Sequence, residues 1–522
     1  MALDEVGPLS TSTSDFSFQT SQFTLDEQLP PRALWPALLH TLPALQYPVT
    51  LNLAEQLLAA ADRSPRSTAI LHHGERISYQ ELRERTLSAA GALVRLGVEP
   101  ADRVVLRLHN TPDFIVAWLA VQWLGAVGVP IPPVYRRREL EHIVGHAGAA
   151  FAIAAADLAA DVEVAARGIA HSIRVVTALT DGGVPPPPYP TPSDGPALIT
   201  YITSATGAPR GAVHSPAEIL ATADTYAREV LELSARDICV GLPSMAWAFG
   251  LGALLVFPLR AGASTVLADA SGPPLPALIA DTRATVLYAV PTMYRLLLRQ
   301  PDLESFDFTS LRCCVSAAEA LPAVVVEAWR ARTGLEILDG LGTTELAHIF
   351  ISARSGAVRP DSIGRVVAGY EARIVDEDLG ELPSGVPGLL AVRGPTGARY
   401  WRDAEAQASV VRDGWTLTGD VCVREADGSF VHLRRSDDLI VSGGCKISPR
   451  EVDCALRDHP DVVSAQVFAV HDPIRGAVPH ATVTLSPGAV PTGAVERLQQ
   501  YLKQELAPYK CPRVIHVLSD GK

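Results

Sequence analysis

The sequence lacks the cysteine patterns of disulfide-rich and zinc-binding proteins. Its seven cysteines are scattered over 522 residues, and none has a second cysteine or a histidine at CxxC or CxxH spacing. An odd number of scattered cysteines argues against a disulfide framework, and a zinc site needs clustered ligands. We therefore expect reduced thiols in a cytoplasmic protein.

Basic residues are also scarce. Lysine and arginine together number 44 against 57 acidic residues, so the formal net charge is −13 at pH 7. This balance argues against nucleic acid or an anionic membrane as the main partner, because both carry dense negative charge. The hydrophobic content of 48% nevertheless predicts a globular rather than a disordered chain.

No targeting or membrane-spanning segment is predicted. Residues 1–10 carry two acidic side chains and no basic start, unlike a signal peptide. The uncharged residues 114–135 are numerous enough to cross a membrane, but two glycines and three prolines interrupt their second half. We expect a short buried helix there, followed by a strand.

The chain is too long for one hydrophobic core, and its pattern predicts two domains. Strand-like segments alternate with helical ones, which predicts parallel βαβ units. These segments are residues 68–71, 102–108, 238–242, 264–267, 285–289, 313–316 and 336–339.

Three other stretches depart from this alternation. Residues 1–47 predict a surface arm, residues 184–196 an extended proline-rich linker, and residues 363–394 a small β-rich subdomain. After Asp437 a compact α+β pattern follows. The expected fold is therefore α/β. It has a large N-terminal domain, 1–436, of two βαβ-type subdomains plus the β-rich one, and a small mobile C-terminal domain, 437–522.

One loop has the composition of a phosphate site. Residues 200–211 follow an apolar, strand-like lead and combine hydroxyls with a glycine, a proline and Arg210. Such loops place backbone N–H groups, hydroxyls and a cation around a phosphate chain. A surface turn uses the same residue types, so the loop alone leaves both interpretations open.

Five more motifs follow in order, at residues 314–322, 338–345, 413–420, 433–438 and 443–452. Together with the loop, this series resembles the adenylate-forming superfamily of acyl-CoA synthetases, peptide-synthetase adenylation domains and luciferases. The resemblance covers residues 51–512. Residues 342–350, 28–31 and 45–48 are most similar to benzoate and aminobenzoate CoA ligases.

The resemblance implies a two-step reaction. A carboxylate is activated with ATP to an acyl-adenylate, the small domain turns, and coenzyme A attacks to give a thioester and AMP. The expected small molecules are a carboxylate or its adenylate, coenzyme A, AMP, and ATP with Mg²⁺ where the first step occurs.

The resemblance also implies residue roles at the nucleotide end. Asp420 is expected to bind the ribose hydroxyls, Arg435 to lie near ribose and phosphate, and Glu345 to associate with Mg²⁺, with no other metal ligand. The remaining cofactor-binding candidates are Thr203, Thr206, Arg210, Ala318, Glu319, Asp339, Gly340, Gly342, Thr343 and Thr344.

A second set is expected at the acyl group and in the second step. The acyl-pocket candidates are Trp247, Phe249, Gly250, His348 and Ile349. The catalytic candidates are His348, Trp247, Gly444 in the thiol tunnel, and Asp437 as the hinge.

The sequence departs from the family pattern in four places, and two of them, the phosphate loop and the carboxy-terminal lysine motif, serve the ATP step. Ser204, Ala205 and Arg210 stand for a glycine, a hydroxyl and a lysine in the phosphate loop, and Ala318 stands for a glycine. Arg434 and Val441 replace a glycine and a lysine. In place of the family's carboxy-terminal lysine motif there is only Gly521-Lys522.

These departures predict an enzyme specialised for the second half-reaction, in which an acyl-adenylate and coenzyme A give acyl-CoA and AMP. A separate adenylating enzyme would then supply the adenylate. Three alternatives are a complete ATP-dependent acyl- or aryl-CoA ligase, an adenylation protein that loads a carrier, and a non-catalytic binding homologue.

Overall fold

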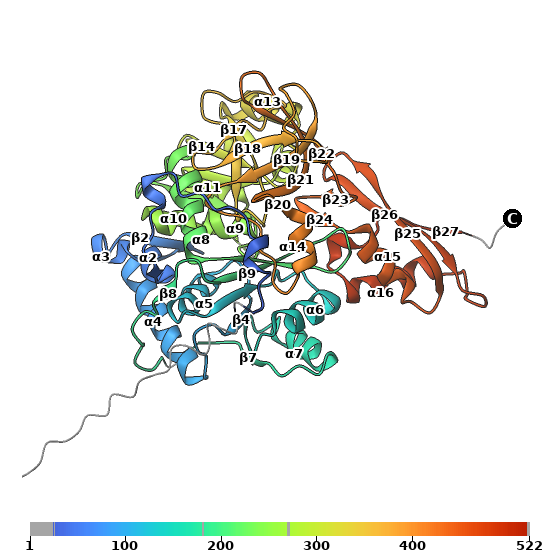
Figure 1. The fold of residues 1–522 in the computed structure, drawn as a ribbon, viewed down its shortest axis with the longest axis horizontal. Coiled ribbons are helices and arrows are strands. Elements are labelled where there is room, and N and C mark those ends of the chain that lie inside the picture. Colours follow the sequence, from blue (N-terminus) through green and yellow to red (C-terminus); the bar gives the residue numbers. More distant parts are fainter. Residues whose placement is uncertain (1–24, 26, 180–181, 269–271, 519–522) are drawn as a thin grey trace, which may run out of the picture.

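The computed structural model describes residues 25, 27–179, 182–268 and 272–518, in a large and a small domain (Figure 1). The predictions for residues 1–10 and for Gly521-Lys522 lie outside this part. The large domain contains two sheets flanked by helices and a third, antiparallel sheet. The small domain, drawn in red, lies against one side of the large domain.

The first sheet has the strand order β10-β9-β5-β4-β6-β7. All neighbours are parallel except β9 and β10, which flank the predicted phosphate loop. Its strands are β4 (Arg103–Arg107), β5 (Val127–Pro130), β6 (Phe151–Ala154), β7 (Arg174–Val176), β9 (Leu198–Ile202) and β10 (Arg210–His214). Helices α4 (Tyr79–Arg95), α5 (Pro112–Trp123), α6 (Arg137–Ala147) and α7 (Ala159–Gly168) belong to this region.

The second sheet has nine strands in the order β17-β16-β15-β14-β13-β11-β12-β2-β3. The strands are β2 (Thr68–His72), β3 (Glu75–Ser78), β11 (Ile238–Gly241), β12 (Ser264–Leu267), β13 (Val286–Ala289), β14 (Cys313–Ser316), β15 (Ile337–Gly342), β16 (Ile349–Ser352) and β17 (Arg365–Val366). The helices of this part of the chain are α2 (Leu53–Leu57), α3 (Ala60–Arg63), α8 (Pro216–Thr222), η3 (Ala223–Val230), α9 (Ala248–Leu251), η4 (Gly252–Val256), α10 (Phe257–Ala261), α11 (Leu275–Thr282), α12 (Pro291–Leu298), η5 (Leu303–Ser305) and α13 (Ala323–Thr333).

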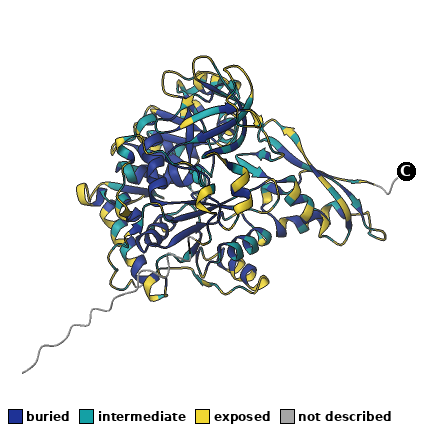
Figure 2. Ribbon diagram, viewed as in Figure 1, coloured by how far each residue is buried: buried dark blue, intermediate teal, exposed yellow. Residues whose placement is uncertain are grey.

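The second sheet is parallel from β15 to β2 and antiparallel at its two ends. Helices flank both sheets, and their central strands are buried and largely apolar, as Figure 2 shows by the dark colour of these strands. Ser78 begins α4, and its side chain forms a reciprocal capping box with Glu81. The uncharged residues 114–135 form part of α5 and then β5, also as predicted. No described helix has both the length and the apolar character of a membrane span.

The third sheet contains most of the β-rich segment predicted at residues 363–394 and extends beyond it to residue 435. It is antiparallel and consists of β18 (Glu371–Val375), β19 (Gly388–Arg393), β20 (Val411–Arg412), β21 (Trp415–Arg424) and β22 (Phe430–Arg435), with α14 (Ala404–Val410) beside it. The proline-rich linker is not wholly irregular, because β8 (Thr191–Pro192) pairs with β1 (Thr50–Leu51). The arm includes η1 (Arg32–Leu34) and η2 (Pro43–Leu45), and it buries Leu29 and Leu45.

The small domain has its own sheet and hydrophobic core. It consists of β23 (Ile440–Ser442), β24 (Cys445–Ile447), α15 (Pro449–Arg457), β25 (Val462–Asp472), β26 (Gly476–Leu485), α16 (Ala494–Glu505), η6 (Pro508–Lys510) and β27 (Ile515–Leu518). Asp437 lies in the link between β22 of the large domain and β23 of the small one. The boundary at Asp437 and the mobility of the small domain stay predictions.

Candidate active site

A cavity of about 630 Å³ lies between the two domains. Its floor is formed by the carboxyl ends of the neighbouring parallel strands β11, β13, β14 and β15, which is where open α/β sheets bind ligands. Strand β22 and the turn between β23 and β24 close it from the other side. Sixteen of the sequence-predicted site residues line it: Thr203, Trp247, Phe249, Gly250, Ala318, Glu319, Asp339, Gly340, Gly342, Thr343, Thr344, His348, Ile349, Asp420, Arg435 and Gly444.

The other four candidates, Thr206, Arg210, Glu345 and Asp437, do not line the cavity. The Arg210 guanidinium lies 3.3 Å from the Asp403 carboxylate and 5.8 Å from the centre of the Tyr400 ring. The Tyr400 hydroxyl donates to Glu345 at 2.9 Å. A tyrosine therefore links the arginine of the phosphate loop to the carboxylate expected to associate with magnesium.

Two hydroxyls of the phosphate loop, those of Ser204 and Thr206, are bonded within the loop. Ser204 Oγ lies 2.6 Å from Thr206 Oγ1 and donates to the Ala208 carbonyl at 2.9 Å. Ser204 is also buried. In this arrangement the side chain that stands for the family's glycine stabilises the turn, while Thr203 lines the cavity.

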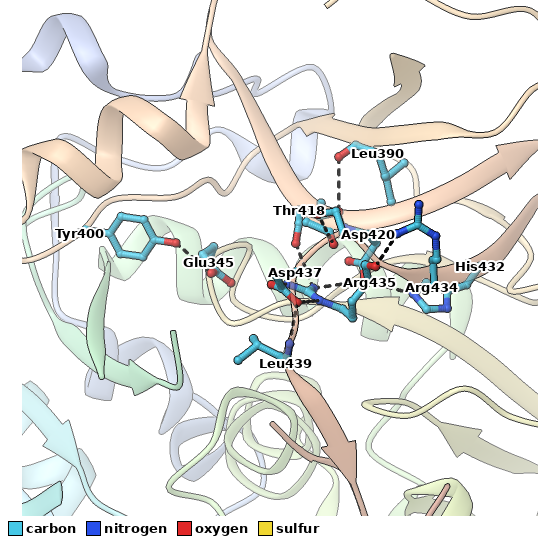
Figure 3. A network of polar contacts seen from close by, with 12 residues as sticks. Glu345, Leu390, Tyr400, Thr418, Asp420, His432, Arg434, Arg435, Asp437 and Leu439 are labelled. Atoms are coloured by element: carbon cyan, nitrogen blue, oxygen red, sulfur yellow. Dashed lines mark hydrogen bonds and ion pairs between the residues drawn. The ribbon is translucent and has the colours of Figure 1, made fainter. Parts of the chain in front are cut away.

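Asp420 and Arg435 form the centre of a polar cluster, shown in Figure 3. Asp420 Oδ1 accepts from His432 Nε2 at 3.1 Å and from Arg435 at 3.2 Å, and Arg435 also binds Asp437. Burial opposes ionisation of Asp420, yet the hydrogen bond from His432 and the charge of Arg435 lower its pKa to about 2. Asp420 Oδ2 has no partner among the described residues, so it is free to accept from a ligand hydroxyl.

The strand end at β15 supplies a flat, narrow wall. A side chain on Gly342 would place its Cβ 2.6 Å from the His348 carbonyl oxygen, so only glycine fits there. Asp339 Oδ1 is buried without a hydrogen-bond partner among the described residues. Burial raises the pKa of Asp339 to about 8, so this carboxyl is protonated at neutral pH.

The part of the cavity predicted to hold the acyl group is lined by aromatic rings. His348 is buried, and its ring centre lies 4.5 Å from that of Phe257 and 5.6 Å from that of Phe249. Burial lowers the pKa of His348 to about 3, and its Nε2 lies 3.4 Å from the Phe249 carbonyl. A neutral imidazole among aromatic rings suits the flat, apolar part of a substrate better than a charged one.

The small domain contributes the β23–β24 turn to the cavity. Gly443 and Gly444 both have positive φ, and a Cβ on Gly444 would lie 3.1 Å from Val290 Cγ1. Glu319, across from this turn, accepts from the Thr292 hydroxyl at 2.9 Å and lies 3.5 Å from Arg295. It therefore positions α12 beside the turn as well as lining the cavity.

Sequence reasoning missed several residues that line the cavity, among them Tyr135, His432, Lys446 and Tyr509. Lys446 belongs to the glycine-containing motif at 443–452, and this motif could have identified it as a site residue. The other three come from segments without a motif of their own, and only the folded chain brings them together.

No group of three or more potential metal ligands occurs among the described residues. Glu345 fits the one carboxylate that Mg²⁺ uses when nucleotide phosphates supply most of its other ligands. The hydrogen bond from the Tyr400 hydroxyl would orient the Glu345 carboxylate.

Two family models match the chain: AMP-binding enzyme over residues 57–401, and AMP-binding enzyme C-terminal domain over residues 451–521. The benzoate–CoA ligase of Thauera aromatica is 33% identical over 92% of this chain and 95% of its own length. The anthranilate–CoA ligase of Pseudomonas aeruginosa is 33% identical over 90% and 92%. The crystal structure of the anthranilate CoA ligase AuaEII with anthranoyl-AMP has a TM-score of 0.72, 30% identity, and coverage of 92% and 95%.

A large α/β domain and a small domain that close over one cavity define the class of adenylate-forming enzymes. The two matching models span both domains, and the curated relatives match along nearly their whole length. The chain belongs to the family of AMP-binding enzymes.

Proposed function

We propose that this protein is an ATP-dependent aryl-CoA ligase. An aromatic acid and ATP give an aryl-adenylate and pyrophosphate, and coenzyme A then converts the adenylate into aryl-CoA and AMP. The benzoate and anthranilate ligases among its relatives support an aromatic substrate. One observation carries the proposal: the same cavity has the Asp420–Arg435 cluster, an aromatic pocket around His348, and the Gly444 turn of the small domain.

Each part has a chemical task in this reaction. Asp420 offers an ionised carboxylate with a free oxygen to the ribose hydroxyls, and Arg435 lies beside it as a cation. The rings of Phe249 and His348 enclose the aryl group, which fixes its carbonyl near the nucleotide. The glycines of the β23–β24 turn leave room for a slender thiol to reach that carbonyl.

The second half-reaction alone is a second candidate. It is favoured by the internal bonding of the phosphate loop, where Ser204 binds Thr206 and Arg210 faces Asp403. Groups engaged in this way would have to be released to hold the β- and γ-phosphates. The similarity to benzoate and anthranilate CoA ligases favours the complete reaction.

The test offers benzoate, 2-aminobenzoate and hydroxybenzoates with ATP, Mg²⁺ and coenzyme A, and measures aryl-CoA by mass spectrometry. A second arm offers synthetic benzoyl-AMP and coenzyme A without ATP. Thioester in both arms supports the complete ligase, and thioester in the second arm alone supports the half-reaction. A carrier-loading function would instead require a carrier protein as acceptor in either arm, and no thioester in any arm would overturn both candidates.

A further inference from the structure

Lysine is confined to the end of this chain. It occurs at four positions, 446, 503, 510 and 522, and the whole segment before residue 446 has none. Lys503 is exposed on α16, whereas Lys510 is buried between Glu139 and Glu451. Lys522 lies outside the described residues. Lys446 on β24 is the one lysine of the described chain that lines the cavity.

Lys446 lies among charged groups without pairing to any of them. The pKa of the Lys446 ammonium is lowered, chiefly by burial and then by the nearby charge of Arg435. The carboxylates of Glu345, Asp420 and Asp437 oppose this shift without reversing it. No described residue makes a hydrogen bond or an ion pair with its ammonium group within 4.0 Å.

The other cations at this end of the cavity are already engaged. Arg435 is bound by Asp420 and Asp437, and Arg210 lies against Asp403 outside the cavity. Arg434 is exposed and donates to the Arg435 carbonyl. A partly buried ammonium without a carboxylate partner is costly unless an anion joins it. The position of Lys446, next to the expected ribose ligand Asp420, places such an anion at the nucleotide.

We propose that Lys446 binds the α-phosphate of the aryl-adenylate and stabilises AMP as the leaving group in thioester formation. This inference rests on the proposed function. In that step the C–S bond forms and the carbonyl C–O bond of the mixed anhydride breaks. The electron pair goes to the phosphate oxygen of AMP, and the thiol proton leaves to water. Lys446 faces the oxygen on which this negative charge develops.

The small domain delivers this lysine. Lys446 is on β24, directly after the Gly443-Gly444 turn that faces the acyl end, so one short segment supplies both the thiol's path and the cation. The ion pairs of α6 with α16 and η6 hold the segment in place.

The kinetic test compares Lys446→Ala, Lys446→Arg and the matched control Lys503→Ala in the reaction of synthetic benzoyl-AMP with saturating coenzyme A. We expect Lys446→Ala to lower kcat by ~10²–10³-fold, the usual loss when one preorganised charge is removed. Lys446→Arg should restore part of the rate, and Lys503→Ala should equal wild type. A Lys446→Ala rate within twofold of wild type would overturn the proposal.

The same lysine could instead serve the phosphates of coenzyme A, and the acceptor distinguishes the two. Pantetheine has the thiol but no phosphate. If Lys446 acts on AMP, the deficit of Lys446→Ala persists with pantetheine. If the deficit disappears with pantetheine, the lysine acts on coenzyme A and the proposal is wrong.

A labelling experiment tests the contact without any turnover. Wild-type protein is treated with acetic anhydride, with and without millimolar AMP, and lysine acetylation is read by peptide mass spectrometry. AMP should protect Lys446 and leave Lys503 equally reactive. Equal acetylation of Lys446 with and without AMP, under conditions where AMP raises the melting temperature, would contradict the proposal. Failure of the wild-type enzyme to form any thioester would overturn the proposed function instead, and the labelling result would still be readable.

Discussion

Lys510 Nζ of the small domain lies 3.0 Å from Glu139 Oε1 of the large domain, and both side chains are almost completely buried. Glu451 Oε1 lies 2.7 Å from the same ammonium, so two carboxylates share this lysine. Nearby, Glu505 of α16 accepts from Arg137 at 2.7 Å and from Arg138 at 3.1 Å. These contacts hold the small domain in the orientation in which the Gly444 turn faces the cavity.

Weakening this interface should affect the second reaction step selectively. In Glu505→Gln the side chain keeps its size but loses the charge that binds two arginines. We expect the reaction of benzoyl-AMP with coenzyme A to slow by ~10-fold, equivalent to about 1.4 kcal/mol of lost interface stability. Pyrophosphate exchange should stay within twofold, because the first step does not use the Gly444 turn. The control is Asp62→Asn, whose partner Arg83 lies within the large domain; equal loss in both steps would contradict the prediction.

We predict that replacing Ala318, which lines the cavity, with glycine stabilises the protein. The φ of Ala318, 72°, lies in the left-handed region, where a Cβ costs roughly 1–2 kcal/mol. Ala318→Gly should therefore raise the free energy of unfolding by ~0.5–1 kcal/mol, after the added flexibility of glycine is subtracted. Urea denaturation measures this change. Ala317→Gly, at a buried neighbour without positive φ, should lower stability instead; the same sign for both would contradict the strain argument.

We predict that Asp339 makes the free energy of unfolding depend on pH. Its pKa is raised by burial from the usual 3.8 to about 8, so the native state loses stability as the pH rises from about 4 through about 8. Asp339→Asn removes this loss. The stability of the variant relative to wild type should grow by up to about 1.4 kcal/mol per pH unit within that window. Urea titrations at pH 5, 7 and 9 test this, with the exposed Asp378→Asn as control; a constant difference would show that Asp339 is ionised in the fold.

Two substitutions of His348 distinguish the contribution of ring packing from that of hydrogen bonding in the predicted aryl pocket. His348→Ala removes a buried ring beside Phe249 and Phe257 and should destabilise the protein by ~2–4 kcal/mol. His348→Phe keeps the ring and should stay closer to wild type in stability, while losing the contact with the Phe249 carbonyl. Thermal melting and the KM for benzoate measure both effects. Equal destabilisation by the two substitutions would show that the imidazole nitrogens, rather than the ring, stabilise the pocket.

The sequence predicted the elements that depend on local pattern. The buried strands and the α+β tail follow from hydrophobic periodicity, and the structure confirms them. Sixteen predicted site residues meet at one cavity because each follows the carboxyl end of a strand or belongs to a motif.

What the sequence could not predict depends on contacts between distant segments. The link of Arg210 and Glu345 through Tyr400 joins three segments far apart in the sequence, and His432 reaches Asp420 across neighbouring strands. From the sequence alone, Lys446 is expected to be an ordinary surface lysine. It becomes a candidate for phosphate binding only because the small domain packs over the cavity, which periodicity does not reveal.

The most direct test of the account is pyrophosphate exchange without coenzyme A. The protein is incubated with an aromatic acid, ATP, Mg²⁺ and labelled pyrophosphate, and label entering ATP is measured. A complete aryl-CoA ligase predicts exchange that requires the acid and is lost in Asp420→Ala, in which the carboxylate expected to bind ribose is missing. No acid-dependent exchange with any acid of the panel, in a preparation that converts benzoyl-AMP and coenzyme A into benzoyl-CoA, would contradict the claim that this protein performs both steps.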